Sequence, residues 1–138
     1  MNKKEQRETV KHIIEHSGIK DNLDLDMSNK EMIDLIIHYI ETHKWLLNEK
    51  IQFDITCDQA IFSWHENVYF PLLHAMRTSL IFRAFPEKRV FELFSELSDA
   101  HFYATEKDKW IAYEDVIKKY ILENSTKFLP KLLTRIFY

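Results

Sequence analysis

The segment HIIEH, from His12 to His16, carries two histidines and a glutamate at a spacing that can bind a metal ion. On a helix, residues i and i+4 lie on one face, so His12 and His16 can hold zinc while Glu15 serves as a general base. A third ligand is needed, and the sequence singles none out. Histidines at a helix end are also favoured by the helix dipole. The sequence favours a solvated helix end, with a metal site at His12, Glu15 and His16 as the alternative.

Other chemically active side chains do not form a recognisable catalytic set. Ser63, His65 and Glu66 are close in sequence, but neighbours at i and i+2 point to different sides of a helix. His43 lies on an apolar stripe, which favours a hydrogen-bonded core histidine over a metal ligand. The only glycine is Gly18, so a glycine-rich phosphate loop is excluded. We therefore predict no catalytic residue and no cofactor.

The densest basic stretch contains Arg77, Arg83, Lys88 and Arg89. Together they could form a small patch for an anion or a partner. A solvated rim is the simpler interpretation, because the chain as a whole has a formal net charge of −3. Charges of both signs are scattered, which argues against a nucleic-acid or anionic membrane surface.

Composition indicates a single domain spanning residues 1–138 with an ample core. Apolar residues make up 46% and aromatic residues 14% of the 138. Cys57 is the only cysteine, which favours a reducing compartment. No apolar run approaches the ~20 residues of a membrane span, and the first 17 residues do not read as a signal peptide. We therefore expect a cytoplasmic protein with no membrane partner.

Apolar periodicity predicts an all-α fold of six to seven helices. The first runs from Asn2 to Ser17. An acidic loop follows, and Ser28 with Glu31 forms a candidate capping box for a helix reaching Lys50. Thr56 with Gln59 is a second candidate box. Further helices are expected after a break or kink at Pro71, after a break at Phe85-Pro86, over Tyr113 to Glu123, and after Pro130.

The helices repeat a pattern, which predicts two pseudo-symmetric halves at about residues 29–85 and 86–138 behind an N-terminal helix. Residues 33–50 align with residues 90–107. After a one-residue deletion, ITCDQAIFSW aligns with IAYEDVIKKY. Such units bury their apolar faces on each other. The aligned marker pairs are Trp45 with Phe102, Glu49 with Glu106, Trp64 with Tyr120 and Pro71 with Pro130.

Glu49 and Glu106 are expected near helix C-termini, where the helix dipole disfavours a carboxylate by roughly 0.3–1 kcal/mol. We hypothesise that each carboxylate accepts backbone N–H groups from the loop or helix start that follows. A solvated Glu-Lys pair is the alternative.

Four segments carry a family resemblance: HKWLLNEK, AIFSWHENVYFPLL, MRTSLIFRAFPEKR and ELFSELSDAHFYATEK. They resemble a bacterial family of all-helical domains of unknown function, in which the segments run roughly H-x-W-Y-L-x-E, W-x-x-N-V-Y-x-P-L and F-P-x-R. Its members are often found C-terminal to ParB-type nuclease-like domains or beside kinase-like domains. The resemblance covers residues 43–121 and departs where Val90-Phe91-Glu92-Leu93 replaces a T-E-A-D-L run. It implies a helical accessory module, and the family has no established catalytic residues to transfer.

The sequence thus predicts a non-catalytic interaction or regulatory module that works through a protein partner, with self-association left open. Two alternatives remain. One is a metal-binding helical protein or metal-dependent hydrolase, suggested by HIIEH. The other is an accessory factor in DNA transactions, suggested only by the ParB-type association.

Overall fold

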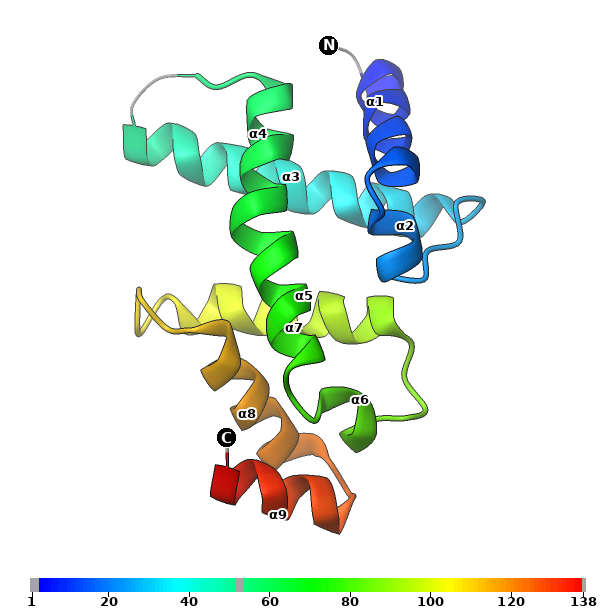
Figure 1. Ribbon diagram of the computed structural model, residues 1–138. Coiled ribbons are helices and arrows are strands. Elements are labelled where there is room, and N and C mark those ends of the chain that lie inside the picture. Colours follow the sequence, from blue (N-terminus) through cyan, green and yellow to red (C-terminus); the bar gives the residue numbers. More distant parts are fainter. Residues whose placement is uncertain (1–2, 52–53, 138) are drawn as a thin grey trace. The chain divides into compact units, whose positions relative to one another are not determined.

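The computed structural model describes the backbone of residues 3–51 and 54–137, and the side chains of residues 4–50 and 54–136. In these ranges all regular structure is helical, which confirms the predicted all-α class (Figure 1). None of the described helices has the length and apolar character needed to cross a membrane. The chain divides into two compact units, Met1–Asn67 and Val68–Tyr138.

The first unit is a helical hairpin with a shorter helix packed against it. Its long helix, α3, packs on both α1 and α4. Gly18 separates α1 from α2 with a φ of +84°, the left-handed conformation predicted for a glycine after a helix end. The buried side chains come from every element, among them Ile14, Ile33 and Ile36. The helices are α1 (Lys3–His16), α2 (Ile19–Asn22), α3 (Lys30–Ile51) and α4 (Cys57–Trp64).

The start of α3 differs from the prediction. The Asn29 side-chain oxygen accepts from the backbone N–H groups of Glu31 and Met32 at 3.0 and 3.2 Å. Ser28 instead donates from its backbone and its hydroxyl to Asp26. Asparagine is as good a cap as serine, so the residue nearer the first helical turn takes the role. The capping box predicted at Ser28 is therefore wrong.

The start of α4 agrees with the prediction. The Thr56 hydroxyl accepts from the N–H of Gln59 at 3.1 Å, and the Gln59 side chain accepts from the N–H of Thr56 at 2.8 Å. This reciprocal pair is a capping box. The loop before it is held by Asn48, whose side-chain oxygen accepts from the N–H of Ile55 at 2.9 Å.

Of the break or kink predicted at Pro71, the break does not occur. α4 continues through a π-helical turn, η1 (His65–Tyr69), into α5 (Phe70–Arg77). A proline ring clashes with the carbonyl four residues earlier in a regular α-helix, here that of Asn67. A π turn widens the backbone at that place, so it accommodates the ring without ending the helix. Pro71 lies in the first turn of α5.

The second unit encloses its core with four further helices. α8 packs against α5, α7 and α9, and α6 packs against α8 and α9. Figure 1 shows α9 beside α8 at the C-terminal end. Leu93, Phe94 and Leu97 of α7 are fully buried, as is Ile117 of α8. The helices after α5 are α6 (Ile81–Ala84), α7 (Val90–Ala104), α8 (Tyr113–Asn124) and α9 (Phe128–Phe137).

The two predicted halves differ in their helices: α3 is followed by α4, η1 and α5 without a break, whereas residues 125–127 separate α8 from α9 in the second half. The compact units, however, meet at residue 67 and not at residue 85. The superposition of the two halves stays a prediction.

Candidate functional site

The last helix, α9, is anchored at its start to α6. Ser125, which follows α8, is buried, and its hydroxyl donates to the carbonyl of Ala84 at 3.4 Å. The same oxygen accepts from the N–H of Lys127 at 3.1 Å. Pro130 falls in the first turn of α9, where a missing N–H costs nothing. These bonds fix where α9 begins and which side of it meets the unit.

The side of α9 that faces away from the unit is apolar. Phe128, Leu129, Leu132 and Ile136 are 77%, 59%, 37% and 61% exposed. Their spacing, at i, i+1, i+4 and i+8, places them on one side of a helix. We call these four residues the α9 outer face. Single exposed apolar residues are ordinary, but a continuous apolar strip on one helix indicates an interaction site.

The charged residues of α9 itself have one sign. Lys127, Lys131 and Arg135 lie in or next to α9, and the sequence FLPKLLTRIF contains no acidic residue. Lys127 and Arg135 are exposed, and Lys131 is half-buried. The helix therefore combines an apolar strip with three cations, although the chain as a whole is acidic.

The first unit contains a histidine–serine pair that sequence reasoning missed. His43 Nε2 lies 2.8 Å from Ser63 Oγ, and the Asn67 amide donates to the same oxygen at 3.1 Å. Burial lowers the pKa of His43, and the charge of Lys50 lowers it further. The hydrogen-bonded histidine that we predicted is therefore present. The two residues are 20 positions apart, so only the pairing of α3 with α4 could have revealed the contact.

His43 could act as the base of a serine hydrolase, but the helix that carries Ser63 does not supply an oxyanion hole. A neutral imidazole beside a hydroxyl can act as a base. Ser63, however, lies inside a continuous helix, where backbone N–H groups are used in helical hydrogen bonds. Those groups cannot serve as an oxyanion hole. The arrangement joins α3 to α4.

The candidate metal ligands lie on an exposed stretch of α1. The rings of His12 and His16 are 4.3 Å apart, and His16 Nδ1 is 2.8 Å from the carbonyl of His12. Glu15 is exposed. Within the part of the chain that the structure describes, no group of three or more His, Cys, Asp or Glu side chains is placed to hold a metal ion.

The basic stretch is divided by the fold. Arg77, Arg83 and Arg89 are exposed. Lys88 is half-buried, and its ammonium donates to both Glu96 carboxylate oxygens, at 3.0 and 2.8 Å. The charge of Lys88 is thus offset by a neighbour from α7, so Lys88 does not add an unpaired cation to the predicted patch.

Tyr120 completes the cluster around Lys88. Lys88 Nζ donates to the Tyr120 hydroxyl at 3.1 Å, and that hydroxyl forms a short hydrogen bond with Glu96. Hydrogen bonds to Glu96 and Tyr120 raise the pKa of Lys88. Burial acts to raise the pKa of Glu96, but the hydrogen bonds from Lys88 and Tyr120 outweigh it, so this pKa is lowered. The cluster links α7 to α8.

A further pair supports the loop between α7 and α8. His101 Nε2 lies 3.0 Å from the carbonyl of Ile111, and the His101 ring stacks on Tyr113 with centroids 3.9 Å apart. Burial raises the pKa of Tyr113 to about 12. The rings brace the start of α8.

The residue pairs that the predicted repeat aligns are not all buried alike. Trp64 is 2% exposed, whereas Tyr120, the residue aligned with it, is half-buried. Trp45 and Phe102 are both exposed, at 59% and 41%, so neither belongs to the core. Pro71 and Pro130 are both half-buried.

Glu49 and Glu106 are both exposed. The loop that follows Glu49 lies partly outside the described residues, so the predicted backbone hydrogen bonds of this pair stay a prediction. Asn48 and His101 hold the two loops.

Comparison with known proteins gives no relative: no family model matches the chain, and no curated protein or solved structure is significantly similar to it.

Proposed function

We propose that the chain is a protein-interaction module and that it contacts its partner through the α9 outer face. The observation that carries this proposal is the exposure of four large apolar side chains on one side of α9. Leaving such a strip in water forgoes about 25 cal/mol for each Å² that a partner could cover. Clusters of this kind are typical of the centre of a protein–protein interface.

The cations next to the α9 outer face indicate the chemistry of the partner. Lys127, Lys131 and Arg135 carry no hydrogen bond or ion pair from their side chains to described residues. A partner with an apolar strip bordered by aspartate or glutamate would match both features of α9. An amphipathic helix with an acidic border is the simplest such partner, because two helices can pack side by side along their apolar strips.

The family resemblance agrees with this role, since an accessory module acts by binding. A protein partner is favoured over an anionic membrane because α9 already packs on α6 and α8, and among its described residues four large apolar side chains point outward. The metal and DNA alternatives gain no specific observation from the described residues.

The test compares two charge substitutions on the α9 outer face with a matched pair elsewhere. Leu132→Glu with Ile136→Glu places two carboxylates in the strip. Trp45→Glu with Phe62→Glu does the same to two exposed apolar residues of the first unit. Each protein is cross-linked in source cells, and captured proteins are quantified. The leading candidate is then purified and titrated against each variant.

We expect binding to weaken at least tenfold for the α9 pair, with the control pair binding like the wild type and all proteins equally helical by circular dichroism. Equal binding by both variants would remove the α9 outer face as the contact. Sedimentation with vesicles containing anionic lipid is measured in parallel. If the wild type binds these vesicles and the α9 variant does not, the partner is a membrane and the proposal is wrong.

A further inference from the structure

The side chains of α9 form rows, because residues four positions apart lie next to each other along a helix. Lys131 and Arg135 belong to one row, and Lys127 begins it, since the carbonyl of Lys127 accepts from the N–H of Lys131 at 3.4 Å. We call these three residues the cation row. The adjacent row consists of three residues of the α9 outer face: Phe128, Leu132 and Ile136.

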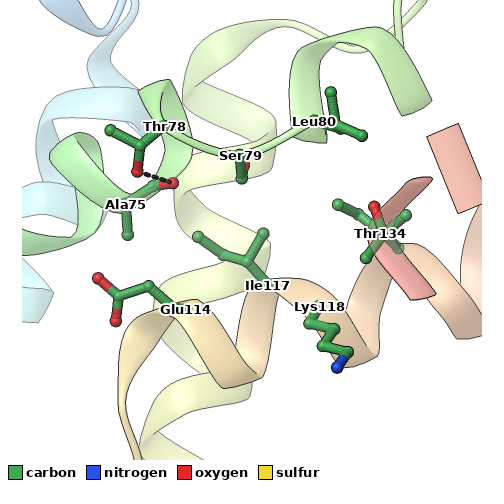
Figure 2. A pocket seen from close by; sticks show the side chains of 9 residues that line it. Ala75, Thr78, Ser79, Leu80, Glu114, Ile117, Lys118 and Thr134 are labelled. Carbon is green, nitrogen blue, oxygen red and sulfur yellow. Dashed lines mark hydrogen bonds between the residues drawn. The ribbon is translucent and has the colours of Figure 1, made fainter. Parts of the chain in front are cut away.

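The other border of this apolar row is also apolar. Leu129, which is 59% exposed, and Leu133, which is half-buried, occupy it. The opposite side of α9 is turned to the unit, because Thr134 is 1% exposed and comes near Ile117 of α8 (Figure 2). A partner that covers the α9 outer face thus meets cations of α9 on one border and leucines on the other.

The one-sided border limits which helix can cover the α9 outer face. Packed helices fit their rows of side chains into each other. Carboxylates that recur at every fourth position of a partner helix can therefore each approach one member of the cation row. Carboxylates on the partner's second border would lie against Leu129 and Leu133, where they lose water and gain no cation from α9. The attraction on one border and this cost on the other discriminate between partners.

The cation row also argues against a second copy of α9 as the occupant. Two copies of α9 that pack along their apolar rows would bring cations of like sign into one interface, which is unfavourable. The sequence of α9, FLPKLLTRIF, contains no acidic residue that could offset them. The occupant is therefore a helix of a different sequence from α9.

We propose that the partner of the α9 outer face is a helix whose aspartates or glutamates recur at every fourth position along a single border of its apolar strip, and that the cation row selects it. This inference rests on the proposed function, because it concerns the occupant of the same face. It assigns the choice of partner to Lys127, Lys131 and Arg135, and it states where the partner carries its charge.

The test uses two synthetic amphipathic helical peptides of identical composition. In the one-border peptide, the glutamates recur at every fourth position along one border of the apolar strip. In the split peptide, the same glutamates are divided between both borders. Each labelled peptide is titrated with the full-length protein and followed by fluorescence anisotropy. We expect the one-border peptide to bind about fivefold to tenfold more tightly at low ionic strength, and this ratio should shrink at high salt.

A charge reversal tests the cation row itself. Lys127→Glu with Arg135→Glu reverses the two members that are exposed. This variant should bind the one-border peptide about tenfold more weakly than the wild type does, and it should prefer a one-border peptide in which lysines replace the glutamates. Lys107→Glu with Lys109→Glu makes the same change of charge at exposed positions after α7, and it should bind like the wild type. Circular dichroism verifies that all proteins are equally helical.

The possible failures of the two proposals differ. Equal affinity of the two peptides for the wild type, or no effect of Lys127→Glu with Arg135→Glu, would overturn the inference. If Leu132→Glu with Ile136→Glu still abolishes binding in that case, the proposed function stands. Failure of both peptides to bind the wild type also overturns the inference, and the cross-linking experiment then judges the α9 outer face by itself. If Leu132→Glu with Ile136→Glu binds the peptides as the wild type does, both proposals are wrong.

Discussion

Protonation of His43 opposes folding, because burial and then the nearby Lys50 charge lower the pKa of this ring. Asn67 already donates to Ser63 Oγ, so the serine proton is free to point at His43 Nε2. A neutral ring accepts that proton, and a charged ring cannot. Below the ordinary histidine pKa of about 6.5, the unfolded chain takes up a proton that the folded chain resists.

The free energy of unfolding should therefore fall as the pH is lowered from 7 to 5, and the fall should end once folded His43 is also protonated. His43→Gln should lower the free energy of unfolding by about 0.5–1.5 kcal/mol at pH 8, because the contact with Ser63 is lost. The difference in this free energy between the variant and the wild type should be smaller at pH 5. Urea unfolding at several pH values measures this. His74→Gln, at an exposed position, is the control. A gap that is the same at every pH contradicts the argument.

The charged form of Glu96 favours folding, whereas the charged form of His43 opposes it. The pKa of Glu96 lies below the ordinary value of 4.5. A lowered carboxyl pKa stabilises the fold above that value, and the stabilisation disappears as the pH falls through the folded pKa. Glu96→Gln should lower the free energy of unfolding by about 0.5–1 kcal/mol at pH 7, a modest figure because the pair is partly exposed. The loss should shrink toward pH 3.

The matched control for this prediction is Glu92→Gln, an exposed carboxylate one turn earlier on α7. It should change stability by less than about 0.5 kcal/mol. Denaturant unfolding at pH 7 and pH 3 compares the two variants. Equal effects at pH 7 would show that the contacts of Glu96 with Lys88 and Tyr120 add nothing.

At the scale of elements, the caps of α3 and α4 provide a direct comparison. Asn29→Ala removes the side chain that accepts two N–H groups at the start of α3. Thr56→Ala removes half of the capping box of α4. Each should lower the free energy of unfolding by about 1 kcal/mol. Ser28→Ala, by contrast, should cost less than about 0.5 kcal/mol, and a larger cost would restore Ser28 as the cap.

Most helices could be predicted because apolar periodicity is local information. The box at Thr56 follows from residues three positions apart. The cap of α3 could not be chosen in the same way, since Ser28 and Asn29 are equally good caps and adjacent. The sequence could not decide between a break and a kink at Pro71, because the π turn that accommodates the ring has no sequence signature.

The candidate sites depend on information that the sequence does not contain. The apolar residues of α9 were recognised, but which of them point outward is decided by packing against α6 and α8. In the second unit, Thr134 comes near Ala75 and Ile117, although these residues are far apart in the chain (Figure 2). His43 and Ser63 likewise meet only through the pairing of α3 with α4.

At the scale of the whole molecule, the predicted repeat makes a quantitative claim about aligned positions. Ile36 of α3 and Leu93 of α7 align, and both are completely buried. Trp45 and Phe102 align, and both are exposed. If the two halves share one architecture, each aligned pair should respond alike to truncation, despite the different chemistry of its members.

Ile36→Ala and Leu93→Ala should each lower the free energy of unfolding by about 2–5 kcal/mol, because both leave a cavity in a packed core. Trp45→Ala and Phe102→Ala should each cost less than about 1 kcal/mol, since most of each ring is already in water. Denaturant unfolding of the four variants measures both pairs. A large cost for only one member of either pair would indicate that the similar phrases in the sequence do not occupy equivalent places, and the repeat would then be a coincidence of amphipathic helices.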